Sequence, residues 1–355
     1  MHGVLYRDSS MNRILIIAPN WIGDAVMSQP LLATLKAHYP HCQIDVLASL
    51  WVAPIYRACI EVHQVIEAQL EHKQLQWGLR KQLAKQLEKN QYDACYVLPN
   101  SLKSALIPWL ANIPLRIGYR GEMRFGLINI ALDNPRKINR PPMANHYLAL
   151  CNALVHSQEI NVNEPVKPTL NISSTAKESV SAQLLVAGID KRFIYVLCPG
   201  AEYGVTKRWP AEYFATLAKQ LISHEPNAQI ILLGGKGDHV LASSIQSQAD
   251  HLPQIHNWCG STSLDEAIAL IGMSKVLVSN DSGLMHVGAA LEVPQVAIFG
   301  SSDPHHTPPL SNKAKVLWLN LPCSPCHKRE CPLGHLKCLK DITPATVLST
   351  IQTLH

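Results

Sequence analysis

Residues 12–24 read NRILIIAPNWIGD, an apolar run followed by a short segment that ends in Gly23 and Asp24. Four consecutive aliphatic residues bounded by turn-forming residues are typical of a strand in a buried parallel sheet. An amphipathic stretch at 25–38 follows and indicates a helix. The segment therefore predicts the first strand, tight turn and helix of a βαβ unit, with Asp24 at or near the N-cap of the helix.

The same alternation returns along the chain. Further apolar runs, separated by helical patterns, lie at 44–47, 94–98, 193–197, 230–233, 276–279 and 296–299. Because 355 residues exceed what one hydrophobic core usually serves, we predict two doubly wound α/β domains of the Rossmann type, at 11–170 and 171–340, facing each other across a cleft. A linker at 159–178 sets the boundary. The final helix, 341–355, is a candidate to pack back on the first domain.

Composition excludes several classes of protein. The net charge of +5 is mild and its basic residues are scattered, so nucleic-acid binding is not indicated. No apolar stretch approaches the ~20 residues that span a bilayer, and the run at 14–17 is too short for a signal peptide. Residues 1–10 lack the periodic pattern and are treated as an extension outside the fold. Six of the ten cysteines lie apart in ordinary contexts, as reduced core thiols do.

Two loops of the second half suit a phosphate. Residues 198–210 read CPGAEYGVTKRWP and place Gly200, Thr206 and Lys207 between a strand and a helix. Residues 280–286 read NDSGLMH and open a helix of small residues, whose first backbone N–H groups would bind a diphosphate. The alternatives are a basic surface loop in the first case, and in the second a capping Asp281 with a packed His286.

Three other features are open to two interpretations. Asp238, in the segment LGGKGDH at 233–239, either accepts hydrogen bonds from ribose hydroxyls or belongs to a flexible glycine turn. Basic residues after candidate strands of the first domain form either an acceptor-binding patch or solvated surface charge; they are Lys103, Arg116, Arg120 and Arg124. Four clustered cysteines, with His335 nearby, either bind a structural zinc ion or remain free thiols; they are Cys323, Cys326, Cys331 and Cys338.

Five motifs in order resemble the ADP-heptose:lipopolysaccharide heptosyltransferases, glycosyltransferase family 9, and the likeness runs along nearly the whole chain from Met11. They are ILIIAPNWIGDAVMSQPL (14–31), LPNSLKSAL (98–106), IGYRGEMRFGLIN (117–129), CPGAEYGVTKRWP (198–210) and VSNDSGLMHVGAAL (278–291). The resemblance implies a GT-B fold, an N-terminal acceptor domain, a C-terminal nucleotide-sugar domain and an inverting transfer without an obligate metal. The implied reaction moves L-glycero-D-manno-heptose from ADP-heptose to the heptosyl inner core of lipopolysaccharide.

The resemblance also assigns roles to residues. Asp24 matches the general base, with Glu202 in reserve, and Lys207 matches the lysine at the leaving diphosphate. Asp238 matches the ribose ligand. Further donor-binding residues implied are Gly200, Thr206, Asp281, Ser282, Gly283, Leu284 and His286. The implied setting is cytoplasmic, at the inner face of the inner membrane, with peripheral membrane contact. Alternatives are addition of another core heptose, a GT-B sugar-nucleotide epimerase, and a metal-dependent interaction module built on the tail cysteines.

Overall fold

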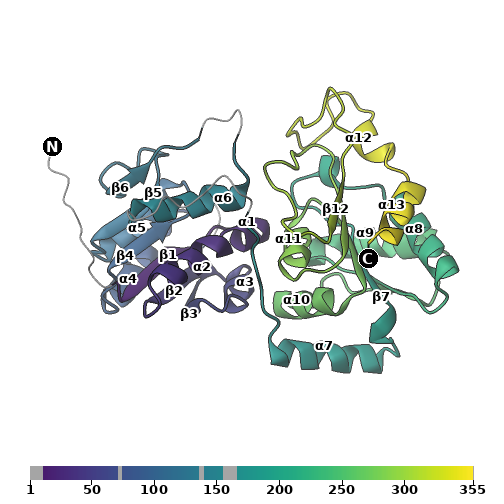
Figure 1. Ribbon diagram of the computed structural model, residues 1–355, viewed down its shortest axis with the longest axis horizontal. Helices are drawn as coiled ribbons and strands as arrows, with labels where there is room; N and C mark the ends of the chain where they lie inside the picture. The colour runs from purple at the N-terminus through teal and green to yellow at the C-terminus, as the bar shows by residue number, and fades with distance from the viewer. Residues whose placement is uncertain (1–10, 71–73, 136–139, 155–165, 355) are drawn as a thin grey trace. The chain divides into compact units, whose positions relative to one another are not determined.

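The computed structural model describes residues 11–70, 74–135, 140–154 and 166–354, and it divides into two compact units, 1–166 and 167–355 (Figure 1). The sequence analysis placed the division at 170/171. Residues 1–10 and the first part of the expected linker lie outside the described residues. Each unit is described by itself below.

The first unit is built on a six-stranded sheet in which every pair of neighbouring strands is parallel. Its order is β3-β2-β1-β4-β5-β6, which is that of a doubly wound fold. The strands are β1 (Arg13–Ile17), β2 (Gln43–Ser49), β3 (Val62–Ala68), β4 (Ala94–Val97), β5 (Leu115–Tyr119) and β6 (Ile130–Leu132). The helices are α1 (Ile22–Met27), α2 (Gln29–His38), α3 (Ala53–Arg57), α4 (Trp77–Glu88), α5 (Leu102–Leu110), α6 (Met143–Leu148) and the 3₁₀ helix η1 (Ala149–Ala153).

The second unit repeats this plan. Its parallel sheet has the order β12-β11-β10-β7-β8-β9, the same winding counted from its own first strand. The strands are β7 (Ile194–Cys198), β8 (Gln229–Leu232), β9 (Ile255–Asn257), β10 (Val276–Asn280), β11 (Gln295–Ile298) and β12 (Ala314–Leu317). The α-helices are α7 (Ser174–Val186), α8 (Ala211–His224), α9 (His239–Gln248), α10 (Leu264–Met273), α11 (Gly283–Ala290), α12 (Lys337–Lys340) and α13 (Pro344–Gln352). Short 3₁₀ turns are η2 (Lys191–Phe193), η3 (Val205–Lys207) and η4 (Lys236–Asp238).

Burial follows the period of each element. On one face of the first sheet, Leu15 and Ile17 of β1 pack in one cluster with Leu83 of α4 and Ile107 of α5. These residues alternate along the strand because successive side chains point to opposite faces. The predicted two-domain α/β fold is thus confirmed, with the carboxyl ends of the strands leading into the loops that carry the candidate residues.

Two expectations about helices need correction. The stretch 25–38 is two helices, because α1 ends at Ser28 and Pro30 in the first turn of α2 has no backbone N–H to continue the ladder. The final helix, α13, belongs to the second unit: Val347 and Ile351 are buried in one cluster with Phe214 of α8. Its apolar side is therefore already covered within its own unit. Within the described ranges, no helix is long and apolar enough to cross a membrane.

Candidate active site

Asp24 lies in the first turn of α1, which follows β1 across a four-residue connection. The N-cap is Trp21, with extended backbone and no capping side chain, so Asp24 is the third helical residue, near the N-cap as the sequence predicts but not the cap itself. It is partly exposed. A partly exposed carboxylate in this position is suited to accept a proton.

Two buried tyrosines, which the sequence analysis missed, lie near this carboxylate. Burial raises the pKa of Tyr147 of α6 well above its usual value, and the negative charge of Asp24 adds to the shift. Burial also raises the pKa of Tyr56 of α3, with a smaller contribution from Asp24. The Tyr56 hydroxyl is hydrogen-bonded to Ser28 Oγ at 2.9 Å, so it is fixed against the end of α1. Both phenols are therefore neutral groups at pH 7.

The four basic residues expected to form one acceptor patch have different environments. Arg116 is the second residue of β5, and its guanidinium donates to the carbonyl oxygens of Ile113 (2.6 Å), Leu127 (2.7 Å) and Gly126 (3.3 Å). It lies near the amino end of its strand, away from the carboxyl ends where ligands of such sheets bind. These contacts engage the Arg116 guanidinium within its own unit, and its assignment to the acceptor site stays a prediction that they do not favour.

Arg124 is engaged in a similar way. Only 4% of it is exposed, and its guanidinium donates to Pro99 O (2.6 Å), to Asn100 Oδ1 (3.0 Å) and to the Tyr119 carbonyl. Burial lowers its pKa, and hydrogen bonds to backbone oxygens hold it between two loops. The assignment of Arg124 to the acceptor site stays a prediction, and the burial of the guanidinium does not favour it.

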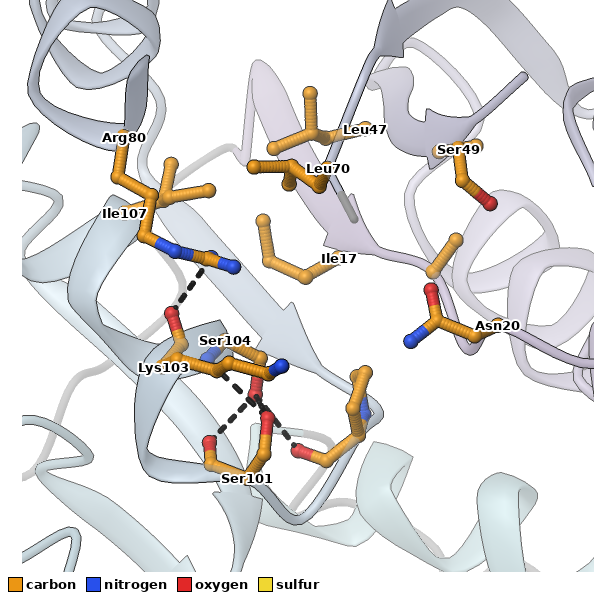
Figure 2. A pocket seen from close by; sticks show the side chains of 13 residues that line it. Ile17, Asn20, Leu47, Ser49, Leu70, Arg80, Ser101, Lys103, Ser104 and Ile107 are labelled. Atoms are coloured by element: carbon orange, nitrogen blue, oxygen red, sulfur yellow. Dashed lines mark hydrogen bonds between the residues drawn. The ribbon is translucent and has the colours of Figure 1, made fainter. Parts of the chain in front are cut away.

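Arg120 and Lys103 remain accessible. Arg120 follows β5 directly, and its exposed guanidinium lies 3.3 Å from Asp133 Oδ1. Lys103, in the first turn of α5, lines a pocket at the carboxyl ends of β1 and β2 (Figure 2). The same pocket contains Arg80 of α4, which the sequence analysis did not single out. The sequence did offer a clue to Arg80, because this arginine lies three residues before Leu83 on the apolar face of a helix.

In the second unit, the loop between β7 and α8 is held at both ends by Asn280. This buried side chain donates to Pro199 O at 2.7 Å and accepts from Trp209 N at 3.0 Å. The Trp209 indole donates to Ile342 O at 2.8 Å, which anchors the far end a second time. The sequence analysis quoted Asn280 within a motif but gave it no role. Its position could have indicated one, because a polar residue at the end of a buried strand needs hydrogen-bond partners.

Lys207 ends the short turn η3 in that loop, and its Nζ lies 2.6 Å from Asp281 Oδ2. The side chain of Asp281 is 5% exposed and that of Lys207 is 21% exposed, so the pair is largely screened from water. Burial lowers the pKa of the neighbouring His286 to about 4, with the charge of Lys207 acting in the same direction and that of Asp281 opposing it. His286 is therefore a neutral, packed residue at pH 7.

The other predicted donor-binding residues fall into two groups. Ser282, Gly283 and Leu284 form the N-terminus of α11, with Ser282 as N-cap, and the first turn of a helix leaves backbone N–H groups without intrahelical partners. Asp281 precedes this cap, so it is not the capping residue of the alternative interpretation. These N–H groups are of the kind that bind a phosphate, and the donor-binding role of Ser282, Gly283 and Leu284 stays a prediction.

Gly200, Asp238 and Thr206 are held by internal contacts. A Cβ on Gly200 would lie 2.3 Å from Asp238 Oδ2, so only glycine allows this close approach. The same Asp238 oxygen accepts from Gly235 N at 3.0 Å, which closes the turn at η4. The Thr206 hydroxyl is buried; it donates to the Lys328 carbonyl and lies 3.1 Å from Ser301 Oγ. These contacts fix the loop, and the donor-binding role of Thr206 stays a prediction.

The cysteine-rich segment packs against this loop. Tyr203 Oη donates to His327 O at 2.8 Å, and Arg329 lies over the Tyr203 ring at 5.2 Å. All ten cysteines are free thiols, and the six scattered ones are buried. Backbone N–H groups, above all that of Leu336, lower the pKa of Cys331. Among the described residues, no three His, Cys, Asp or Glu side chains are grouped to hold a metal ion. A zinc site at these cysteines stays a prediction.

Two doubly wound units, one with a carboxylate at a helix start and the other with a lysine beside a helix N-terminus, are typical of α/β proteins of the GT-B type. The chain belongs to glycosyltransferase family 9, the heptosyltransferases, whose family model matches residues 80–337. It is 42% identical to lipopolysaccharide heptosyltransferase 2 of Salmonella typhimurium, covering 96% of this chain and 98% of the relative. The enzyme of the same name from Escherichia coli is 40% identical, with the same coverage.

A solved structure supports both fold and family. The structure of E. coli ADP-heptose lps heptosyltransferase II matches with a TM-score of 0.82 and 39% identity, over 96% of this chain and 98% of that one. The chain is a glycosyltransferase, and the GT-B fold expected from the motifs is confirmed.

Proposed function

We propose that this enzyme transfers L-glycero-D-manno-heptose from ADP-heptose to the heptosyl inner core of lipopolysaccharide, the reaction of heptosyltransferase II. The observation that carries the proposal is the identity of 42% to a lipopolysaccharide heptosyltransferase 2 over 96% of the chain. The site agrees with it, because a lysine and a helix N-terminus in the second unit suit a diphosphate.

The proposed chemistry is a single displacement with inversion. Asp24 takes the proton of the acceptor hydroxyl as its oxygen bonds to the anomeric carbon of heptose. The bond from that carbon to the diphosphate oxygen breaks, and ADP leaves with its electron pair. Lys207 and the backbone N–H groups at the start of α11 stabilise the charge that grows on the departing diphosphate. Lys207 is already oriented for this by Asp281.

The proposal includes two statements about the setting. First, transfer needs no obligate metal ion, since the charge of Lys207 and the helix dipole act on the diphosphate. Second, the enzyme works in the cytoplasm at the inner face of the inner membrane, where it meets its lipid-linked acceptor through peripheral contact. ADP-heptose and the lipopolysaccharide inner core are its proposed partners, and nucleic acid is not.

A transfer assay followed by mass spectrometry tests the function. The enzyme receives ADP-heptose with inner-core acceptors that carry either no heptose or one. We expect a mass gain of one heptose only on the acceptor that already carries heptose. A gain on the heptose-free acceptor would assign the enzyme to an earlier core position. Conversion of the sugar nucleotide without any acceptor would instead support the epimerase alternative.

A further inference from the structure

Tyr203 lies in the loop between β7 and α8, four residues before Lys207. Its ring faces the ammonium group of Lys207, whose Nζ lies 5.4 Å from the ring centroid. The same ammonium group donates to Asp281 Oδ2 at 2.6 Å. Lys207 therefore contacts both a carboxylate and an aromatic ring.

These two contacts have different effects on the charge of Lys207. The carboxylate of Asp281 orients the ammonium group, but its negative charge offsets that of the lysine. The face of a tyrosine ring also attracts a cation, through its quadrupole, yet the ring carries no net charge. The ring of Tyr203 can thus hold the ammonium group in place while leaving its positive charge for a bound anion.

Tyr203 is itself held by the cysteine-rich segment near the C-terminus. Its hydroxyl donates to His327 O at 2.8 Å, and the Arg329 guanidinium lies 5.2 Å from the ring centroid. The next residue, Gly204, approaches this segment so closely that an added Cβ would lie 2.7 Å from Arg329 O. The loop that carries Lys207 is therefore packed directly against residues 327–329.

Residues 327–329 are in turn tied to the second sheet. His327 N donates to Ser301 O at 2.8 Å, and Ser324 Oγ donates to Gly300 O at 2.6 Å. Gly300 and Ser301 follow β11 directly after Phe299. The position of the Tyr203 ring is thus set by contacts that lead back to the carboxyl end of a central strand.

We propose that Tyr203 is a positioning residue for Lys207, and that residues 327–329 hold its ring in place. The inference rests on the proposed function, because it assigns to Tyr203 an action on the lysine beside the departing diphosphate. It also gives the cysteine-rich segment a part in donor binding. A tyrosine that only stabilised the loop would act on ADP binding whether or not Lys207 was present.

A double-mutant cycle on ADP affinity tests the inference. ADP carries the diphosphate charge in full, so calorimetric titration reports on Lys207 without any transfer reaction. Tyr203→Leu should raise the Kd of ADP by about threefold to thirtyfold, as loss of a cation–π contact does. In a Lys207→Ala background the same substitution should change Kd by less than about twofold, because the residue it acts through is absent.

Tyr203→Phe separates the ring from its hydroxyl. It keeps the ring beside Lys207 but loses the hydrogen bond to His327 O, so its Kd should lie between those of wild type and Tyr203→Leu. An effect of Tyr203→Leu that is equally large with and without Lys207 would overturn the positioning role.

The second unit offers a matched control. Lys275 Nζ lies 5.5 Å from the Tyr195 ring centroid and 2.9 Å from Glu225 Oε2, so it also contacts both a ring and a carboxylate. Tyr195 is the second residue of β7, near the amino end of that strand. Tyr195→Leu should lower the free energy of unfolding but leave the Kd of ADP within about twofold, because ligands of such sheets bind at the carboxyl ends. Equal weakening of ADP binding by Tyr195→Leu and Tyr203→Leu would mean that both act through stability, and the inference would be wrong.

Transfer kinetics distinguish this inference from the proposed function. Tyr203→Leu should lower kcat/KM for ADP-heptose while leaving the acceptor KM unchanged. If heptose transfer is observed but ADP binding shows no coupling between Tyr203 and Lys207, the positioning role is refuted and the function stands. If that coupling is found in an enzyme that does not transfer heptose, the positioning role is retained and the proposed function is refuted.

Discussion

The loop between β7 and α8 in the second unit and the pocket beside α5 in the first both contain cations, but among the residues that the structure describes only the loop also supplies a carboxylate partner. Lys207 pairs with Asp281 at 2.6 Å, whereas Arg80 donates only to carbonyl oxygens. A paired lysine is held in one orientation before any ligand binds, while an unpaired buried cation favours whichever anion enters. We interpret the first arrangement as suited to catalysis and the second to recognition.

The largest effect is expected at Asp24. Asp24→Asn keeps the size of the side chain but cannot accept a proton, so kcat should fall by ~10²–10⁴-fold while ADP binding is retained. Single-turnover transfer and calorimetric titration with ADP measure the two quantities. Retention of more than about a third of the wild-type kcat would mean that Asp24 only stabilises the start of α1, through the helix dipole, and is not the base.

Lys207 provides the direct test of the comparison. Lys207→Ala should lower kcat/KM for ADP-heptose by ~10²–10³-fold, because its contact strengthens as charge develops on the diphosphate. Lys219→Ala is the control, since it breaks an exposed ion pair with Asp250 in the same unit and should change little. If Lys207→Ala leaves kcat/KM for ADP-heptose unchanged, the catalytic interpretation of this loop is wrong.

Asn280 should affect catalysis indirectly, because it holds the loop between β7 and α8 in position. Asn280→Ala leaves Trp209 N–H and Pro199 C=O without their partner, and each buried unpaired group costs about 1–3 kcal/mol. We expect a lower free energy of unfolding and a donor kcat/KM reduced by about tenfold, a shift of ~1.4 kcal/mol. Asn257→Ala, which removes side-chain contacts at β9, should leave the donor KM unchanged; equal effects of both variants would assign Asn280 to stability alone.

Arg124 should affect stability without affecting recognition. Arg124→Met removes donors from three oxygen atoms between two loops, so the free energy of unfolding should fall by about 1–3 kcal/mol. Arg120→Met, at an exposed site, should leave it nearly unchanged. Chemical denaturation of both variants, followed by acceptor kinetics on the folded enzyme, checks this. A raised acceptor KM in a fully stable Arg124→Met protein would return Arg124 to the acceptor site.

The smallest effect is expected from chelation. In EDTA, transfer should stay within about twofold of the untreated rate, because the positive field at the diphosphate comes from Lys207 and the helix N-terminus. Loss of activity that magnesium or manganese restores would contradict this. Unfolding with release of zinc would be a separate result, and it would establish a structural site at the tail cysteines.

Much of the fold could be predicted because buried parallel strands appear in the sequence as runs of aliphatic residues. Ile14–Ile17 and Val276–Ser279 are both fully within strands, and each is followed by a polar loop and a helix. The edge strand β3 was missed, since its half-exposed residues give no such run. The break at Ser28 was missed because the amphipathic period continues across it even though the backbone ladder does not.

The candidate site was predicted only in part, because its motifs are local in the sequence but its contacts are not. The identity of Lys207 and its place after β7 followed from a motif, but its pairing with Asp281 joins residues 74 positions apart. Arg116 and Arg124 were grouped with Lys103 by their charge, yet both guanidinium groups bind backbone oxygens of their own unit. Charge is visible in a sequence, whereas the hydrogen-bond partner that engages it is not.

By itself, the sequence determined the two doubly wound domains, the family and the segments that carry Asp24 and Lys207, because these depend on local patterns of apolar, glycine and polar residues. Only the tertiary structure decided which cations have a carboxylate partner among the described residues and which donate to backbone oxygens. That distinction depends on burial and on contacts between residues distant in the chain, as in the approach of Arg80 to the Lys103 carbonyl across 23 residues. The free energy of a buried charge is set by its surroundings, and these form only when the chain has folded.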